Sequence, residues 1–133
     1  MEGDLCPGGF VTTMADRKRV IVLDDDASML TAVERVLKLH GFQAEVFDTV
    51  ADFFGHAHLR EACCLVLDIN LGGHCGIAVR KQLARDGIPI PVIFITAVDD
   101  KSTKEAALQA GCIAFLHKPF PTQDLIEAIE QVA

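Results

Sequence analysis

Short apolar runs recur along this chain from residue 19 onward. Four of them are continuous and rich in branched side chains, at residues 20–23, 65–67, 92–95 and 113–116. Such runs are typical of strands that are buried on both faces of a parallel sheet. A fifth run, at 44–47, is mixed and includes a charged residue, as in an edge strand. The pattern therefore predicts five strands.

Apolar residues at helical spacing lie between and after these runs. The clearest stripes fall within residues 29–37, 50–57 and 125–132, and weaker ones occur around 76–86 and 101–110. Three helical stretches are followed by a glycine, at Gly41, Gly87 and Gly111. Glycine readily adopts the left-handed conformation that often ends a helix. Strands that alternate with helices indicate an α/β domain in which helices cover both faces of a parallel sheet.

Residues 1–18 precede this alternation and show no periodic pattern. They contain Gly3, Pro7, Gly8 and Gly9 and lack the basic-then-apolar order of a secretory signal. We expect a flexible N-terminal leader over 1–18, with Met14 as a candidate natural start. The remaining residues, 19–133, are the size of one domain.

The composition is that of an acidic domain with a core. Hydrophobic residues make up 50% of the 133 positions, unlike a disordered chain. Twelve Lys and Arg against nineteen Asp and Glu give a net charge of −7 at pH 7. Binding to nucleic-acid phosphates depends on basic patches, so we expect no direct nucleic-acid binding. No apolar run approaches the roughly 18 residues of a membrane span, so we expect no membrane partner either.

The five cysteines do not form a metal or disulfide pattern. They are Cys6, Cys63, Cys64, Cys75 and Cys112, an odd number with no CxxC spacing. Three of them lie in apolar surroundings, where a free thiol behaves as a small hydrophobic side chain. Free thiols indicate a reducing compartment, and we therefore expect a cytoplasmic location.

Polar residues follow the apolar runs at the points where the strands end. The first run ends in residues 24–26, all aspartates, the second in Asp68, the third in Thr96 and the last in residues 117–119. Ligands of an open parallel sheet bind beyond the carboxyl ends of its strands, at the switch point in strand order. With the order 2-1-3-4-5, the aspartates meet there, and Thr96 and Lys118 arrive from neighbouring strands.

The charges of this pocket indicate its chemistry. Asp24, Asp25 and Asp68 repel one another unless positive charge intervenes, and Lys118 together with a divalent cation would neutralise them. All-oxygen ligands favour Mg²⁺, with Mn²⁺ as an alternative. A carboxylate beside such a cation and an ammonium can attack a phosphoryl group, which makes acyl phosphate formation the chemistry that fits best. An acidic triplet also commonly caps a helix, a role that we expect for Asp26 or Ser28.

Four motifs carry a family resemblance. They are Val-Leu-Asp-Asp-Asp at 22–26, Leu-Asp-Ile-Asn-Leu at 67–71 followed by Gly76, Ile-Thr-Ala at 95–97 and Lys-Pro-Phe at 118–120. In this order and spacing, the chain from about residue 17 to 133 resembles a receiver domain of the two-component response-regulator family. The Lys-Pro-Phe ending and the short connections are most similar to FixJ-like receivers. The resemblance implies a single doubly wound, five-stranded parallel sheet of the flavodoxin-like type, with strand order 2-1-3-4-5.

The resemblance assigns the phosphoryl and metal chemistry to the acidic pocket. It makes Asp68 the phosphoacceptor and a Mg²⁺ ligand. It makes Asp25 a direct ligand and lets Asp24 act through water. Asn70 would bind the metal with its backbone carbonyl. The backbones of Asn70 and Ala97 would bind phosphoryl oxygens.

The resemblance also assigns a switch. Thr96 matches the switch hydroxyl, and Lys118 matches the phosphate-binding lysine. The peptide bond between Lys118 and Pro119 is expected to be cis, which is accessible because Pro follows. Phe115 matches the aromatic residue that moves inward when Thr96 turns toward the phosphate.

Two positions depart from the family pattern. The family often has Pro at the position of Gly72, so the pair with Gly73 predicts a looser loop beside Asp68. Val98, two residues after Thr96, occupies a position that tunes dephosphorylation in similar receivers. Its apolar side chain cannot orient an attacking water, so we expect a long-lived phosphorylated form.

The function that follows is a phosphorylation-controlled signalling switch. A sensor histidine kinase or a histidine phosphotransfer protein would donate to Asp68, and the domain would be no enzyme beyond its own phosphorylation and dephosphorylation. An output surface over roughly 100–132 would serve dimerisation or partner docking. Two alternatives stay open, namely a phosphohydrolase of the haloacid-dehalogenase type and a pseudo-receiver that only binds. A flavodoxin is disfavoured because no phosphate-cradling loop follows the first strand.

Overall fold

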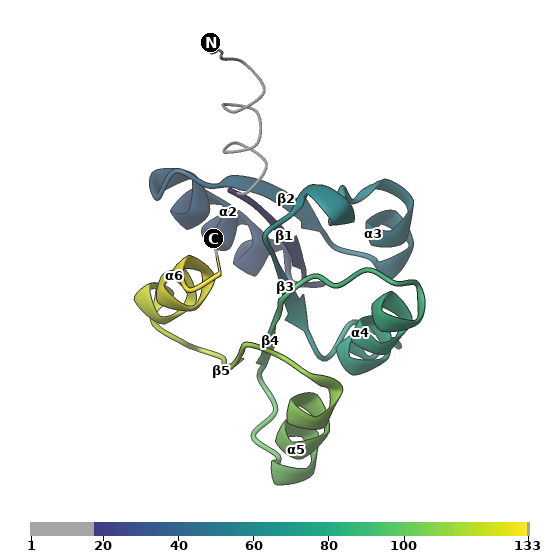
Figure 1. Cartoon of the computed structure of the whole chain (residues 1–133). Helices are drawn as coiled ribbons and strands as arrows, with labels where there is room; N and C mark the ends of the chain where they lie inside the picture. Colours follow the sequence, from purple (N-terminus) through teal and green to yellow (C-terminus); the bar gives the residue numbers. More distant parts are fainter. Residues whose placement is uncertain (1–17, 133) are drawn as a thin grey trace.

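A computed structural model describes residues 18–132 as one five-stranded sheet flanked by helices (Figure 1). The strands are β1 (Arg19–Leu23), β2 (Gln43–Phe47), β3 (Cys64–Asp68), β4 (Val92–Thr96) and β5 (Ala114–His117). The helices are α2 (Ala27–Leu39), α3 (Val50–His56), the short 3₁₀ helix η1 (Leu59–Glu61), α4 (Gly76–Arg85), α5 (Lys101–Ala110) and α6 (Thr122–Glu130). The expected leader over 1–18 lies, apart from its last residue, outside the described residues.

The sheet has the predicted topology. All neighbouring strands are parallel, and their order is β2-β1-β3-β4-β5. The change of direction in strand order lies between β1 and β3, as in other doubly wound folds. This order confirms the flavodoxin-like fold expected from the sequence. It brings the carboxyl ends of β1 and β3 side by side.

The core consists of two layers, one on each face of the sheet. Val20 and Val22 point toward α2 and α6, whereas Ile21 and Leu23 point toward α3 and α4. All four side chains have no exposed surface. Because successive residues of a strand face opposite sides, a strand covered on both faces must be apolar at every position. This explains the continuous apolar runs of the sequence.

The edge strands are less buried than the central three. The residues of β2 are partly exposed, in agreement with its predicted edge position. At the opposite edge, β5 is also only half-buried, and it starts one residue later than the apolar run at 113–116. Ile113 precedes the strand and is exposed. Its apolar character therefore does not reflect burial within the sheet.

Side-chain caps begin α2, α3 and α5, and glycines with positive φ follow α2, α4 and α5. The carboxylate of Asp26 accepts hydrogen bonds from the backbone N–H groups of Ser28 and Met29, so Asp26 is the cap of α2. The three glycines predicted to follow helices all have positive φ, at Gly41, Gly87 and Gly111. Within residues 18–132, no helix is both long enough and apolar enough to cross a membrane.

The cysteines of the described residues are free thiols. Cys64 is fully buried in β3, and burial raises the pKa of its thiol. Burial likewise raises the pKa of Cys63 and Cys112, whereas Cys75 is exposed. The thiols of Cys63, Cys64 and Cys112 thus favour the neutral form. Cys6 lies outside the described residues.

Candidate functional site

Two buried carboxylates and one ammonium meet at the carboxyl edge of the sheet. Asp24 follows β1, Asp68 ends β3, and Lys118 follows β5. Lys118 Nζ donates to Asp24 Oδ2 at 2.8 Å and to Asp68 Oδ2 at 2.9 Å. Asp24 is 0% exposed and Asp68 is 4% exposed. The convergence inferred from the strand ends is therefore present.

Asp24 and Lys118 form an ion pair, and the pKa values of both groups are raised. Burial raises the pKa of the Asp24 carboxyl above its ordinary value, and the neighbouring Asp68 adds to this effect. The hydrogen bonds from Lys118 and from the Asp26 N–H act against it. Burial works to lower the pKa of Lys118, but its two carboxylate partners outweigh it and raise that pKa. The ammonium is therefore held in its charged form at neutral pH.

A third carboxylate completes an acidic cluster. Asp25 is exposed, and one ligand oxygen from each of Asp24, Asp25 and Asp68 lies within 4.8 Å of the others. In the part of the chain that the structure describes, this is the only such group of acidic, histidine or cysteine side chains. Three carboxylates against one Lys118 ammonium leave an excess of negative charge. An all-oxygen donor set of this kind fits a hard divalent cation such as Mg²⁺.

The backbone after β3 folds tightly around Asp68. The Asn70 N–H donates to Asp68 Oδ1 at 2.9 Å, and the Gly76 N–H donates to the Ile69 carbonyl at 2.7 Å. A Cβ atom at Gly76 would lie 2.2 Å from the Asp68 carbonyl oxygen. No side chain fits this approach, so α4 can begin here only because residue 76 is glycine. Gly76, which follows the motif at 67–71, thus allows the backbone to turn closely around Asp68.

The loop that connects β3 and α4 lies next to Asp25 of the acidic cluster. Gly72 and Gly73 have φ values of +51° and +93°. Proline has φ near −65° and could not adopt this conformation at Gly72. A Cβ atom at Gly72 would lie 3.4 Å from Asp25 Oδ2, so the loop lies close to the exposed carboxylate. A proline at position 72 would therefore require another backbone conformation of this loop.

Thr96 ends β4 and is fully buried. Its Oγ1 accepts hydrogen bonds from the backbone N–H of Val98 at 3.1 Å and from Asn70 Nδ2 at 3.2 Å. Its carbonyl accepts a hydrogen bond from the Lys118 N–H at 2.7 Å. The side-chain link between Asn70 and Thr96 was not predicted. Neither residue lies in a periodic pattern that would indicate it.

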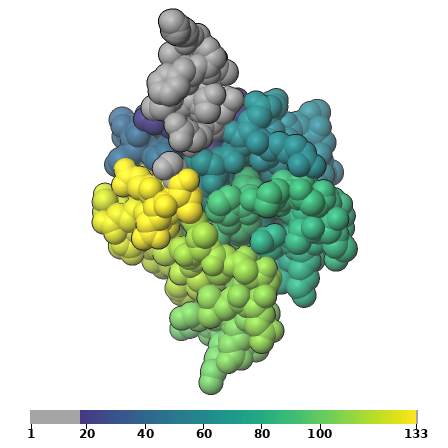
Figure 2. Space-filling view, in the orientation of Figure 1, coloured from purple at the N-terminus to yellow at the C-terminus, as the bar shows by residue number. Residues whose placement is uncertain are grey.

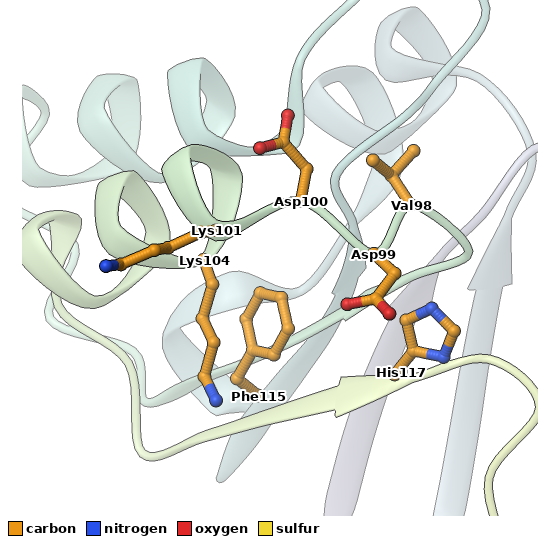
Figure 3. A pocket seen from close by; sticks show the side chains of 7 residues that line it. All are labelled: Val98, Asp99, Asp100, Lys101, Lys104, Phe115 and His117. Atoms are coloured by element: carbon orange, nitrogen blue, oxygen red, sulfur yellow. The ribbon is translucent and has the colours of Figure 1, made fainter.

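Phe115 lies on β5, beside Lys104 of α5 (Figure 3). It is half-buried and forms part of a surface pocket with Val98, His117 and the start of α5. Lys104 Nζ lies 6.0 Å from the centroid of the Phe115 ring, within the range of a cation–π contact. The position assigned to the switch aromatic thus contacts both the core and the α5 surface.

An apolar groove adjoins the site at Lys118. It is bounded by Met29 and Val33 of α2, by Ala97, and by Lys118 and Phe120 after β5. The Lys118–Pro119 peptide bond is cis. Since Lys118 belongs both to the groove and to the site, a partner seated in the groove would lie next to Asp68.

Comparisons with known proteins point to one family. The family model described as Response regulator receiver domain matches residues 20–130. The response regulator protein TodT of Pseudomonas putida is 35% identical over 134 residues, which cover 96% of this chain and 59% of TodT. The chain thus spans little more than half the length of this curated relative.

Solved structures give the same result. A low-resolution structure of the response regulator StyR is 40% identical, with a TM-score of 0.78, and the match covers 86% of this chain and 58% of that chain. The crystal structure of FixJ-N is 29% identical, with a TM-score of 0.77, and covers 86% of this chain and 91% of that chain.

Proposed function

The chain belongs to the response regulator receiver domain family, and we propose that it takes a phosphoryl group onto Asp68 in a Mg²⁺-dependent reaction. The observation that carries this proposal is the bridge from Lys118 Nζ to the buried carboxylates of Asp24 and Asp68, at 2.8 and 2.9 Å. The donor is a phosphohistidine on a sensor kinase or on a phosphotransfer protein. The product is an acyl phosphate that controls an output surface.

The transfer forms one bond and breaks another. A carboxylate oxygen of Asp68 attacks phosphorus, and the bond from phosphorus to the donor's imidazole nitrogen breaks. The electron pair of that bond stays on the imidazole, which takes up a proton from solvent. The Lys118 ammonium offsets the negative charge that accumulates between the carboxylate and the incoming phosphoryl group.

The acidic cluster supports a metal-binding role. Asp25, Asp68 and the Asn70 backbone carbonyl would hold Mg²⁺ directly, and Asp24 would act through water. Bound Mg²⁺ would supply positive charge to the phosphoryl oxygens. Mn²⁺ has the same preference for oxygen ligands and would substitute for it.

Backbone and hydroxyl groups beside Asp68 would bind the transferred group. The N–H of Asn70 already faces Asp68 Oδ1 at 2.9 Å, and the N–H of Ala97 follows Thr96 at the neighbouring strand end. Thr96 would donate its hydroxyl hydrogen to a phosphoryl oxygen. Phe115, next but one to His117 at the end of β5, would repack when Thr96 moves, since it has no hydroxyl of its own.

The apolar groove beside Lys118 supports docking of the donor. Its walls are Met29 and Val33 of α2 and Phe120, and the polar end of the groove is Lys118. We place the approach of the donor histidine on this side, because Lys118 lines the groove and also contacts Asp68. A helix that carries the phosphohistidine between apolar neighbours would bury those neighbours in the groove.

The α5 side supports an output role. Leu108 on α5 is 54% exposed and Ile113 before β5 is 38% exposed. In the space-filling view, α5 protrudes from the molecule (Figure 2). We assign output to the face over residues 100–132, as a homodimer contact or a docking surface. With a net charge of −7, this domain would not itself bind nucleic acid, and we place it in the cytoplasm.

Transfer of radiolabel from acetyl phosphate tests this function. Wild type with Mg²⁺ should become labelled, and chelation of the metal should abolish labelling. Asp68→Asn should remain unlabelled, whereas Asp86→Asn, at an exposed aspartate after α4, should label normally. An unlabelled wild type would favour the pseudo-receiver alternative. Equal labelling of Asp68→Asn would remove Asp68 from the role.

A further inference from the structure

The loop after β3 touches both the proposed phosphoacceptor and the proposed switch residue through a single residue. The backbone N–H of Asn70 donates to Asp68 Oδ1 at 2.9 Å. The side-chain amide of Asn70 donates to Thr96 Oγ1 at 3.2 Å. Thr96 lies 26 positions further along the chain, at the end of β4. Asn70 thus connects Asp68 to Thr96 directly.

The hydroxyl oxygen of Thr96 accepts hydrogen bonds with both of its lone pairs in this arrangement. A hydroxyl oxygen has two lone pairs, and those of Thr96 accept from Asn70 Nδ2 and from the Val98 N–H. Thr96 has no exposed surface, so water cannot replace these donors while the side chain stays in place. Rotation of the hydroxyl toward a group on Asp68 requires that Asn70 and Val98 release it.

The two donors differ in how they depend on sequence. The bond from the Val98 N–H closes a short turn within the same loop and exists for any residue at 98 except proline. The bond from Asn70 comes from another strand end and depends on its amide side chain. Substitution of Asn70 therefore removes its hydrogen bond to Thr96, whereas substitution of Val98 leaves the backbone bond in place.

We infer that the Asn70 side chain is a positioning residue that retains the Thr96 hydroxyl in the unphosphorylated arrangement. The inference rests on the proposed function, because it concerns how Thr96 responds to Asp68. A phosphoryl group bonded to Asp68 brings new oxygens to the site while the Asn70 backbone stays in place beside Asp68. When the Thr96 hydroxyl turns to donate to one of these oxygens, only its bond from the Asn70 side-chain amide has to break at residue 70.

A double-mutant cycle on the unphosphorylated protein tests the contact itself. Asn70→Ala, Thr96→Val and the double variant are compared with wild type by urea unfolding. If Asn70 acts on Thr96, the two substitutions couple by about fivefold in the unfolding equilibrium constant, the size of one hydrogen bond. The matched control pairs Asn70→Ala with Thr49→Val, which removes the distant cap of α3 and should be additive. Additivity in the Thr96 cycle would overturn the inference.

The retaining role is tested by binding of beryllofluoride, a phosphoryl mimic, with Mg²⁺. Asn70→Ala should bind it up to about fivefold more tightly, because Thr96 no longer has to be released. The same substitution in the Thr96→Val background should leave the affinity unchanged. Unchanged or weaker binding by Asn70→Ala alone would overturn the retaining role. A wild type that binds no beryllofluoride would instead count against the proposed function, while the cycle would still decide the contact.

Discussion

Lys118 and Asp68 lie 50 positions apart in the sequence, yet Lys118 Nζ donates to Asp68 Oδ2 at 2.9 Å. The same ammonium reaches Asp24, 94 positions away, at 2.8 Å. The parallel sheet makes this possible, because it aligns the carboxyl ends of β1, β3 and β5 at one edge. The site is thus a product of strand order, and its negative charge exceeds its positive charge until a cation binds.

Neutralising Asp24 should stabilise the metal-free protein. Burial raises the pKa of Asp24, so the stability linked to its protonated form is complete below its ordinary pKa of 3.8 and is lost as pH rises through the higher folded value. At pH 7 the buried charge is therefore a cost. We expect Asp24→Asn to increase the free energy of unfolding by about 1 kcal/mol at pH 7, with no gain at strongly acidic pH.

Magnesium provides the internal check on this prediction. Asp24→Asn should gain less stability from added Mg²⁺ than wild type does, because one carboxylate of the cluster is lost. Asp99→Asn, at an exposed aspartate beyond β4, serves as the charge-matched control. It should change neither the free energy of unfolding without metal nor the stability gained from Mg²⁺. Thermal unfolding that finds Asp24→Asn less stable than wild type without metal would show that its pairing with Lys118 outweighs its burial.

Gly76 should tolerate no side chain. In Gly76→Ala the new Cβ would lie 2.2 Å from the Asp68 carbonyl oxygen, so the loop or α4 must move. We expect a loss of at least about 2 kcal/mol of unfolding free energy. Gly55→Ala is the matched control, because no atom lies within 4 Å of its Cβ and α3 should gain about 0.5 to 1 kcal/mol. Equal effects in urea unfolding would contradict the close approach.

Glu45 should make stability depend on pH at the β2 edge. Arg19 Nη1 lies 2.9 Å from Glu45 Oε2, and both the His58 N–H and its imidazole contact this carboxylate. Burial works to raise the pKa of Glu45, but its bonds to His58 and the charges of His58 and Arg19 outweigh it and lower the pKa. The stabilisation is therefore present above the ordinary pKa of 4.5 and is lost as pH falls through the lower folded value.

The corresponding test is unfolding of Glu45→Gln across pH. At pH 7 we expect a loss of about 1 to 2 kcal/mol, which should shrink in acid as Glu45 of the wild type becomes protonated. Glu34→Gln, at a more exposed glutamate that pairs with Lys38 within α2, should cost at most about 0.5 kcal/mol. A pH-independent difference for Glu45→Gln would assign its effect to packing.

The acyl phosphate should be long-lived. Val98 is 42% exposed beside Thr96, and its apolar side chain cannot hydrogen-bond a water that attacks phosphorus. The label on wild type should persist far beyond seconds in Mg²⁺ buffer. Val98→Gln should shorten its lifetime severalfold, and Val98→Ala, still apolar, should not. Loss of label from wild type within seconds would contradict this expectation.

The strands and their polar ends could be predicted from sequence for a simple reason. Val22 and Leu67 lie in runs that are apolar at every position, because helices cover both faces of the sheet. The carboxyl ends of such strands share one edge, and the strand order 2-1-3-4-5 that the family resemblance implies then places Asp24 and Asp68 together. The family resemblance, including the likeness to FixJ, is confirmed by the comparisons.

Other features could not be predicted, because they depend on loop paths and on side-chain geometry. Asn70 contacts Thr96 only because the loop after β3 turns back toward β4, and no periodicity encodes that turn. The pair between Arg19 and Glu45 depends on the register of β1 against β2. The 3₁₀ helix Leu59–Glu61 was also missed, since three residues are too few to show a period.

Identification of the phosphorylated residue is the decisive experiment. Borohydride reduces an acyl phosphate on aspartate to homoserine, so protein treated with acetyl phosphate and Mg²⁺ can be reduced, digested and examined by mass spectrometry. We expect homoserine at position 68 alone, and none when the metal is chelated. Homoserine at another aspartate, with Asp68 intact, would contradict the assignment of Asp68 as the phosphoacceptor.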